Sequence, residues 1–294
     1  MLQWTLPIAT ALIAAGTALS AGQKDEPPQL QKVAVGHGVE LHYVERGKGA
    51  PVLFVHGTLG DYSVWDAQLR PFAETYRAIA YSRRYNYPNT NKLRPNHSAA
   101  VEAEDLAVLI KKLDLGKVHV VGHSYGGYTA LFLAVKHPEL VRTLTLAEPP
   151  VVFTGDRVPD AKKRLVKQAQ AAFEKGDTEA AVRAIVDSSR AGTYDKVPEP
   201  FRKLLLRNAR ELEALVTSKN MYPALDRDAV RKIAVPTLLL SGEKSTLAQK
   251  SIDKELVRLL PERQRVIIRG ADHGMLFQQP QACRQAVLEF LRGK

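Results

Sequence analysis

The segment VVGHSYGGYTALFLA (120–134) places one serine, Ser124, between Gly122 and Gly126. An apolar run precedes the serine and a helical pattern follows it, so the order is strand, G-x-S-x-G, helix. A turn this sharp crowds the chain, and glycine removes the Cβ atoms that would clash. It also lifts the hydroxyl above the carboxyl end of a sheet, where open α/β sheets bind ligands. The pattern therefore predicts that Ser124 is a nucleophile.

A histidine late in the chain is the predicted base for this serine. A serine hydroxyl is a poor nucleophile until a base removes its proton. His273, in GADHGM (270–275), lies in the loop after the last predicted strand. His123 directly precedes the nucleophile and is expected to point away from it. The other histidines are expected in a hairpin, in loops, in a strand and at a helix end (His37, His42, His56, His97, His119 and His137).

The segment VHGTLG (55–60), straight after the apolar run 52–55, predicts an oxyanion hole. A loop there can aim the backbone N–H of Thr58 toward Ser124, and the N–H of Tyr125 points to the same place. Two such donors stabilise a tetrahedral intermediate, and losing one costs roughly 10²–10³ in rate. His56 is expected to support this turn.

The elements that must position these residues alternate between strands and helices. Two alternating segments, 31–35 and 39–45, predict a hairpin around Gly36 and Gly38. Apolar runs then predict strands that are buried on both faces, as in parallel sheets (50–55, 77–81, 117–121, 141–147, 236–241 and 265–269). Helical patterns separate these runs, so the fold class is α/β, with a doubly wound, mostly parallel sheet.

The alternation stops between the strands at 141–147 and 236–241. Residues 151–231 show only helical patterns (160–175, 178–190 and 199–219), which predicts a helical insertion in a core formed by 32–150 and 232–294. Residues 1–21 carry no charged side chain and end in small residues, which predicts a cleaved export signal, with an uncleaved anchor as the alternative. A polar linker, 22–31, follows. No stable membrane span is expected after processing.

These motifs together resemble the α/β-hydrolase fold superfamily. HGTLG (56–60), GHSYGG (122–127) and GADH (270–273) occur in the family's order, each after a strand, and the likeness extends from about residue 33 to the C-terminus. The resemblance implies a serine nucleophile, a histidine base, and a cap formed by the helical insertion. The loop 80–88 departs from the family's D-x-R-G-x-G pattern and is expected to be structural.

The acidic partner of His273 is where the chain departs from the family. Many members carry an aspartate in G-x-x-D after the strand that follows the cap, and here SGEKS (241–245) has Ser245 at that position. Glu148 ends the strand that follows the nucleophile helix, and a right-handed crossover places it beside Ser124. Certain haloalkane dehalogenases place their acid after this strand. Glu148 is therefore the predicted acid, and Glu243 or no working acid are the alternatives.

The composition argues against several other classes of function. The net charge is +11, but the basic residues are spread along the chain and interleave with acids, so no nucleic-acid partner is expected. The single cysteine, Cys283, cannot form an intrachain disulfide and is expected to be a small buried hydrophobe. No metal or organic cofactor is expected.

The predicted function is hydrolysis of a small or medium carboxylic ester through an acyl-enzyme on Ser124. Dehalogenases and epoxide hydrolases of this fold need an aspartate nucleophile, which this chain lacks. The alternatives on the same triad are a C–C bond hydrolase and a cofactor-free perhydrolase. An alternative of another class is a weakly catalytic ligand-binding protein, suggested by Ser245 at the usual position of the acid.

Overall fold

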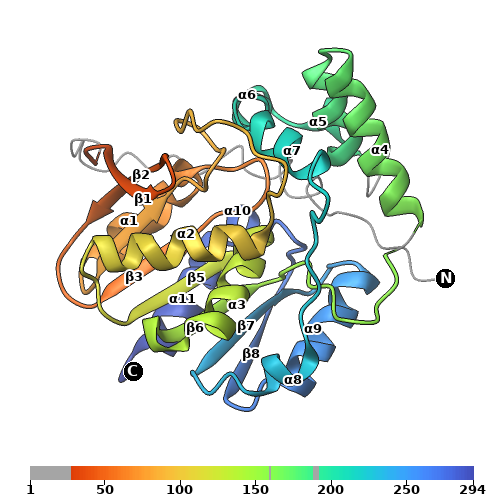
Figure 1. Cartoon of the computed structure of the whole chain (residues 1–294). Coiled ribbons are helices and arrows are strands. Elements are labelled where there is room, and N and C mark those ends of the chain that lie inside the picture. The colour runs from red at the N-terminus through yellow and green to blue at the C-terminus, as the bar shows by residue number, and fades with distance from the viewer. Residues whose placement is uncertain (1–27, 159, 188–191) are drawn as a thin grey trace.

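The computed structural model describes residues 28–158, 160–187 and 192–294 (Figure 1). The predicted export signal, and most of the linker after it, lie outside these ranges. Within them, no helix combines the length and the apolar character needed to cross a membrane.

The described residues form one eight-stranded mixed sheet in the order β1-β2-β4-β3-β5-β6-β7-β8. The strands are β1 (Gln31–Gly36), β2 (Val39–Arg46), β3 (Pro51–Val55), β4 (Arg77–Tyr81), β5 (Val118–His123), β6 (Val141–Ala147), β7 (Thr237–Gly242) and β8 (Arg263–Ile268). β2 pairs antiparallel with β1 and β4, and all other pairs are parallel. The predicted fold class and the early hairpin are confirmed.

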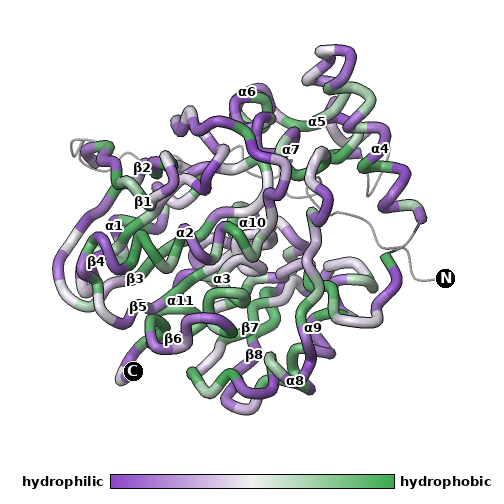
Figure 2. Tube along the Cα trace, in the orientation of Figure 1, coloured by the Kyte–Doolittle hydropathy of each residue, from purple (hydrophilic) through white to green (hydrophobic). Residues whose placement is uncertain are grey.

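Helices cover both faces of the sheet, and each face has its own apolar core. On one face lie α2 (Ala99–Lys112), α3 (Tyr125–Lys136) and α9 (Leu247–Leu259), with α8 (Arg227–Arg231) against α9. On the other lie α1 (Asp66–Ala73) and α11 (Pro280–Leu291), and the short helix α10 (Met275–Gln278) precedes α11. Figure 2 shows apolar residues concentrated in the central strands and in α3. These strands are buried on both faces, as their unbroken apolar runs predict.

The last strand does not follow that rule. β8 is the edge strand of the sheet, and of its residues only Ile268 is buried. Its sequence, RQRVII, begins with polar side chains that face solvent. The prediction of a strand buried on both faces was wrong here, because a strand at the edge of a sheet has a neighbour on one side only.

Between β6 and β7 the described residues form helices and one isolated bridge, Phe153–Leu225. Helices α4 (Asp160–Glu174), α5 (Thr178–Val186), α6 (Glu199–Arg207) and α7 (Ala209–Val216) pack around a separate apolar cluster that includes Leu59 of the core. They lie together at the upper right of Figure 1, beyond the ends of the strands. We refer to them as the helical insertion.

The single helix predicted over 199–219 was wrong, because the chain breaks at Asn208 between α6 and α7. The side chain of Asn208 is buried, donates to Asp61 Oδ2 at 2.7 Å and accepts from the N–H of Tyr87 at 2.8 Å. These bonds to loops of the core hold Asn208 outside the helical conformation, with φ −103° and ψ 8°. A helical pattern in the sequence carries no sign of such long-range bonds.

Candidate active site

Ser124 lies at the tip of the turn between β5 and α3 in a strained conformation. Its φ of 52° and ψ of −124° are rare for a residue with a side chain. A Cβ at Gly126 would lie 2.3 Å from the carbonyl oxygen of Val55, and one at Gly122 would lie 2.6 Å from Gly127 Cα. The glycines on both sides of the serine are therefore required by close backbone contacts, as the motif predicts.

The predicted oxyanion loop lies directly against this turn. A Cβ at Gly57 would lie 3.0 Å from Ser124 Cβ, so the loop and the serine are in contact. The N–H of Gly60 donates to the carbonyl of Gly57 at 3.3 Å, which makes a turn with Thr58 inside it. Tyr125 is the first residue of α3, and the first N–H groups of a helix have no acceptor within it. Both predicted donors thus come from segments that adjoin Ser124.

His273 and Glu148 form a buried pair. His273 Nδ1 lies 2.9 Å from Glu148 Oε2, across 125 residues of sequence. An ionised carboxylate can only accept hydrogen bonds, so this contact requires the proton to be on Nδ1. His273 Nε2 is then left without a proton in the neutral ring, and it is buried with no hydrogen-bond partner among the described residues.

The carboxylate of Glu148 is held from several sides. Oε1 accepts from the N–H of Gly242, at the end of β7, at 2.8 Å. Burial raises the pKa of Glu148, but the hydrogen bond to His273, the nearby side chain of Ser245 and the N–H of Gly242 outweigh it, so the net pKa is lowered. These hydrogen bonds keep the carboxylate charged next to the histidine. Glu148 itself has a φ of 48°, which bends the chain directly after β6.

The alternative acid lies elsewhere. Glu243 Oε2 accepts from the N–H of Gly270 at 2.8 Å in an exposed contact. Ser245, at the family's usual acid position, is buried. Of the two candidate acids, the structure brings only Glu148 to His273.

Ser124 and His273 line the same cavity, which has a volume of about 60 Å³. Its wall is mostly apolar and comes from the oxyanion loop, from the 3₁₀ turn Tyr62–Trp65 that follows it, from α6 of the helical insertion and from α10 (Thr58, Leu59, Val64, Leu204, Leu205, Leu276 and Phe277). The helical insertion therefore closes the cavity over the serine.

The expectation that His123 points away from the site was wrong. His123 lines the same cavity, and its ring centroid lies 4.8 Å from that of His273. Its Nε2 lies 2.9 Å from the carbonyl oxygen of His273, which can only accept, so Nε2 carries a proton. Burial lowers the pKa of His123 to about 3, and the neighbouring His273 adds to this effect. The side chain is thus a neutral donor that fixes the loop carrying His273.

His56 supports its turn, as its place in the motif suggests. Its Nδ1 lies 2.9 Å from the carbonyl oxygen of Gly57, and its Nε2 accepts from the N–H of Arg83 at 3.0 Å. With both nitrogens occupied, the ring cannot take a proton from Ser124. Burial and the charge of Arg83 lower the pKa of His56 to about 3.

Sequence reasoning missed a buried ion network behind the oxyanion loop. Arg83 bonds Glu102 at 2.6 Å and Glu211 of α7 at 2.7 Å, and all three side chains are buried. Arg83 also donates to the carbonyl oxygens of His56 and Gly57. The loop 80–88 therefore supports the oxyanion loop and does not line the cavity around Ser124. The only sign of Arg83 in the sequence is a charged residue just after the apolar strand 77–81.

Gln249 was missed as well. Its amide lies beside the Glu148–His273 pair, and a signal for its placement was the T-x-x-Q capping pattern at 246–249.

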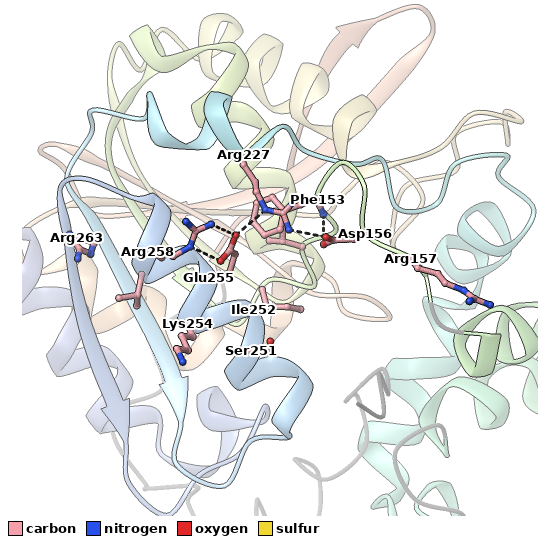
Figure 3. A pocket seen from close by; sticks show the side chains of 12 residues that line it. Phe153, Asp156, Arg157, Arg227, Ser251, Ile252, Lys254, Glu255, Arg258 and Arg263 are labelled. Atoms are coloured by element: carbon pink, nitrogen blue, oxygen red, sulfur yellow. Dashed lines mark hydrogen bonds and ion pairs between the residues drawn. The ribbon is translucent and has the colours of Figure 1, made fainter. Parts of the chain in front are cut away.

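A larger surface groove of about 620 Å³ lies over α8 and α9 (Figure 3). Two of its arginines are already paired, since Arg227 bonds both Asp156 and Glu255, and Arg258 bonds Glu255. None of its lining residues is a histidine or a cysteine. The groove therefore offers no chemistry comparable to that of the Ser124 cavity.

Within the described ranges, no group of three or more histidine, cysteine, aspartate and glutamate side chains is arranged to hold a metal ion. Cys283 is buried against Met275, and burial raises its pKa to about 12, so its thiol stays protonated.

Comparison with known proteins places the chain in one family of hydrolases. The sequence profile of the alpha/beta hydrolase fold family matches residues 50–280. The chain is 27% identical to 2-(acetamidomethylene)succinate hydrolase of Mesorhizobium japonicum, over 89% of this chain and 94% of that protein. It is 26% identical to the non-heme chloroperoxidase CPO-A1 of Kitasatospora aureofaciens, over 86% and 96%. Among solved structures, a thermophilic esterase from Thermogutta terrifontis is similar with a TM-score of 0.71 and 25% identity, over 90% of this chain and 98% of that one.

Proposed function

Because the chain belongs to the alpha/beta hydrolase fold family, we propose that it is a serine hydrolase that cleaves a small or medium carboxylic ester through an acyl-enzyme on Ser124. The observation that carries this proposal is the 2.9 Å contact between His273 Nδ1 and Glu148 Oε2, next to a cavity that His273 shares with Ser124. A serine, a histidine and an acid in this relation are the parts of a catalytic triad, in which the acid stabilises the protonated histidine.

In the proposed reaction, His273 Nε2 takes the proton of Ser124 as Oγ attacks the ester carbonyl carbon. The N–H groups of Thr58 and Tyr125 stabilise the oxyanion of the tetrahedral intermediate. The imidazolium then gives its proton to the leaving alkoxide as the C–O bond breaks, and Glu148 stabilises the positive ring throughout. Water, deprotonated by His273, hydrolyses the acyl-enzyme and restores the Ser124 hydroxyl.

The cavity supports a short acyl group. Its volume of about 60 Å³ is far below the roughly 300–1,000 Å³ of pockets that hold drug-sized ligands. Leu204 and Leu205 of the helical insertion and Phe277 of α10 give it apolar walls, which suit an alkyl chain better than a charged one.

The relatives support hydrolase chemistry, and an experiment must decide which type of bond the protein cleaves. A fluorophosphonate probe should label the full-length protein, and Ser124→Ala should abolish labelling. Product analysis on a panel of short 4-nitrophenyl esters, a vinylogous diketone, and an ester with hydrogen peroxide then separates an esterase from a C–C hydrolase or a perhydrolase. Release of acid and alcohol from the esters is the expected result.

The non-catalytic alternative makes a different prediction. It was suggested by Ser245 at the usual acid position, and the pairing of Glu148 with His273 offers another source for the missing charge. If the wild type neither reacts with the probe nor turns over esters, while small esters raise its melting temperature, the proposed hydrolase activity is wrong and ligand binding is favoured.

A further inference from the structure

A glutamine outside the predicted triad contacts both its acid and its base. Gln249, in the first turn of α9, is buried, and its Nε2 donates to Glu148 Oε2 at 2.7 Å. The same nitrogen lies 2.6 Å from His273 Nδ1. Together with the 2.9 Å contact of Nδ1 with Oε2, these three atoms form a nearly equilateral triangle.

The orientation of this amide is set by the end of the helix. Gln249 Oε1 accepts from the N–H of Thr246 at 2.9 Å and from its hydroxyl at 2.8 Å, which completes a capping box. Turning the amide over would place its NH₂ group against the N–H of Thr246 and its oxygen against the Glu148 carboxylate. The oxygen must therefore face Thr246, and the nitrogen must face the triad.

This arrangement has two consequences for the pair. A donor to Oε2 fixes the plane of the Glu148 carboxylate, whose other oxygen is held by the N–H of Gly242. The amide nitrogen and His273 Nδ1 are both donors, so Oε2 accepts from the two of them side by side.

We propose that Gln249 is a positioning residue that holds the Glu148 carboxylate in the orientation in which Oε2 accepts from His273 Nδ1. The proposal rests on the proposed triad. It assigns a role to the segment after β7, where the family usually carries its acid. In this chain that segment supplies hydrogen-bond donors, from Gly242 and Gln249, to an acid that comes from the end of β6.

Other titratable groups surround the pair and are held constant by the test. His123 of β5 lies against the His273 ring, Asp272 adjoins it in the same loop, and Asp253 of α9 lies near Glu148. Asp253 accepts from Ser241 at 2.6 Å and is paired with Arg265 at 2.6 Å, so it is already engaged.

The test compares Gln249→Leu and Gln249→Glu with the matched control Thr246→Ala in the full chain. Gln249→Leu removes the donor at nearly the same volume, and Gln249→Glu keeps the acceptor for Thr246 but adds a negative charge beside His273. Thr246→Ala removes the hydroxyl of the same helix cap but keeps the backbone N–H that orients the amide, and it does not touch Glu148 or His273. Hydrolysis of 4-nitrophenyl acetate is measured against pH.

We expect Gln249→Leu to lower kcat about 10- to 100-fold with little change in KM, as for the loss of one hydrogen bond to a charged group. We expect Gln249→Glu, which cannot donate to Oε2 when ionised, to lose at least as much, and Thr246→Ala to keep the wild-type kcat. Equal kcat values for all four proteins, or a loss that Thr246→Ala shares, would show that Gln249 only caps α9.

A second measurement does not depend on turnover. The ¹⁵N resonances of His273 report which ring nitrogen carries a proton. The neutral ring should carry it on Nδ1 in the wild type, and Gln249→Leu should shift part of the population to the tautomer with the proton on Nε2. If the wild type fails to react with a fluorophosphonate, the proposed function is wrong. The tautomer ratios still decide the proposal for Gln249, and equal ratios in the two proteins overturn it.

Discussion

The backbone N–H of Leu59 donates to Glu211 Oε2 at 2.9 Å, across 152 residues of sequence. Leu59 follows Thr58 in the oxyanion loop, and Glu211 belongs to α7 of the helical insertion. The other oxygen of Glu211 bonds Arg83, which holds the carbonyl oxygens of the same loop. Buried charged side chains thus hold the loop beside Ser124, with Arg83 on the side of the core and Glu211 on the side of the helical insertion.

Glu211→Gln is expected to weaken the contact between Arg83 and the helical insertion. The amide keeps an oxygen for the N–H of Leu59 but leaves Arg83 with one buried counter-charge fewer, and breaking a buried pair costs roughly 3–5 kcal/mol. Urea unfolding should show a large loss of stability, and kcat/KM should fall because the Thr58 N–H is less well placed. Glu213→Gln on the same helix is the control. Equal unfolding midpoints for the two variants would contradict the role of Glu211.

Glu148→Gln should abolish most turnover without abolishing the fold. The amide cannot balance the charge of the imidazolium, and the loss of the acid in a triad costs up to about 10⁴ in kcat. Glu243→Gln, which changes an exposed contact, should keep wild-type kcat. Steady-state kinetics on one short ester decide between them, and the opposite ranking would make Glu243 the acid.

Gly126→Ala should be among the most damaging small substitutions in the chain. The added methyl group would lie 2.3 Å and 2.4 Å from the carbonyl oxygens of Val55 and His56, so β5, α3 or β3 must shift. Overpacking of this kind typically costs about 1–3 kcal/mol or more. At Gly60 the nearest atoms lie at 3.4 Å, an ordinary contact, so Gly60→Ala should unfold at a clearly higher urea concentration than Gly126→Ala.

Lys162 of α4 predicts a pH dependence of stability. Its side chain is buried, with Nζ 3.4 Å from the centre of the Tyr222 ring, and burial lowers its pKa from 10.5 to about 7. Between these values the unfolded chain binds a proton that the folded protein lacks, so the contribution of Lys162 to stability rises with pH from about 7 to about 10. Below pH 7 the folded state must bury the charge.

Lys162→Met should remove this dependence. The variant should gain most over the wild type at or below pH 7, and the difference in unfolding free energy should shrink toward pH 10. Lys163→Met, at the neighbouring exposed position, serves as the control in urea unfolding at several pH values. A difference between Lys162→Met and wild type that is constant with pH would mean that the amine is not desolvated.

Much of the fold could be predicted because its signals are local. β4 and β6 have the predicted ends, since a short segment rich in apolar and β-branched residues between helical patterns marks a strand. The turn at Ser124 could be predicted because strand, G-x-S-x-G and helix follow one another directly in the sequence, although the atoms that exclude a side chain at Gly126 belong to Val55 and His56. The candidate acid and base could be predicted because parallel strands end at one edge of the sheet, so residues that follow these strands lie near Ser124.

The sequence by itself thus determined the α/β class, the placement of Ser124 in its turn and the placement of His273 after the last strand, and it favoured Glu148 over Glu243. Only the tertiary structure decided between the two glutamates, turned His123 into the cavity, broke the helix at Asn208 and set Gln249 beside the pair. Each of these depends on a hydrogen bond between residues far apart in sequence. Such bonds form only once the packed sheet and helices have fixed the distance between their partners, and no local pattern of side chains records that distance.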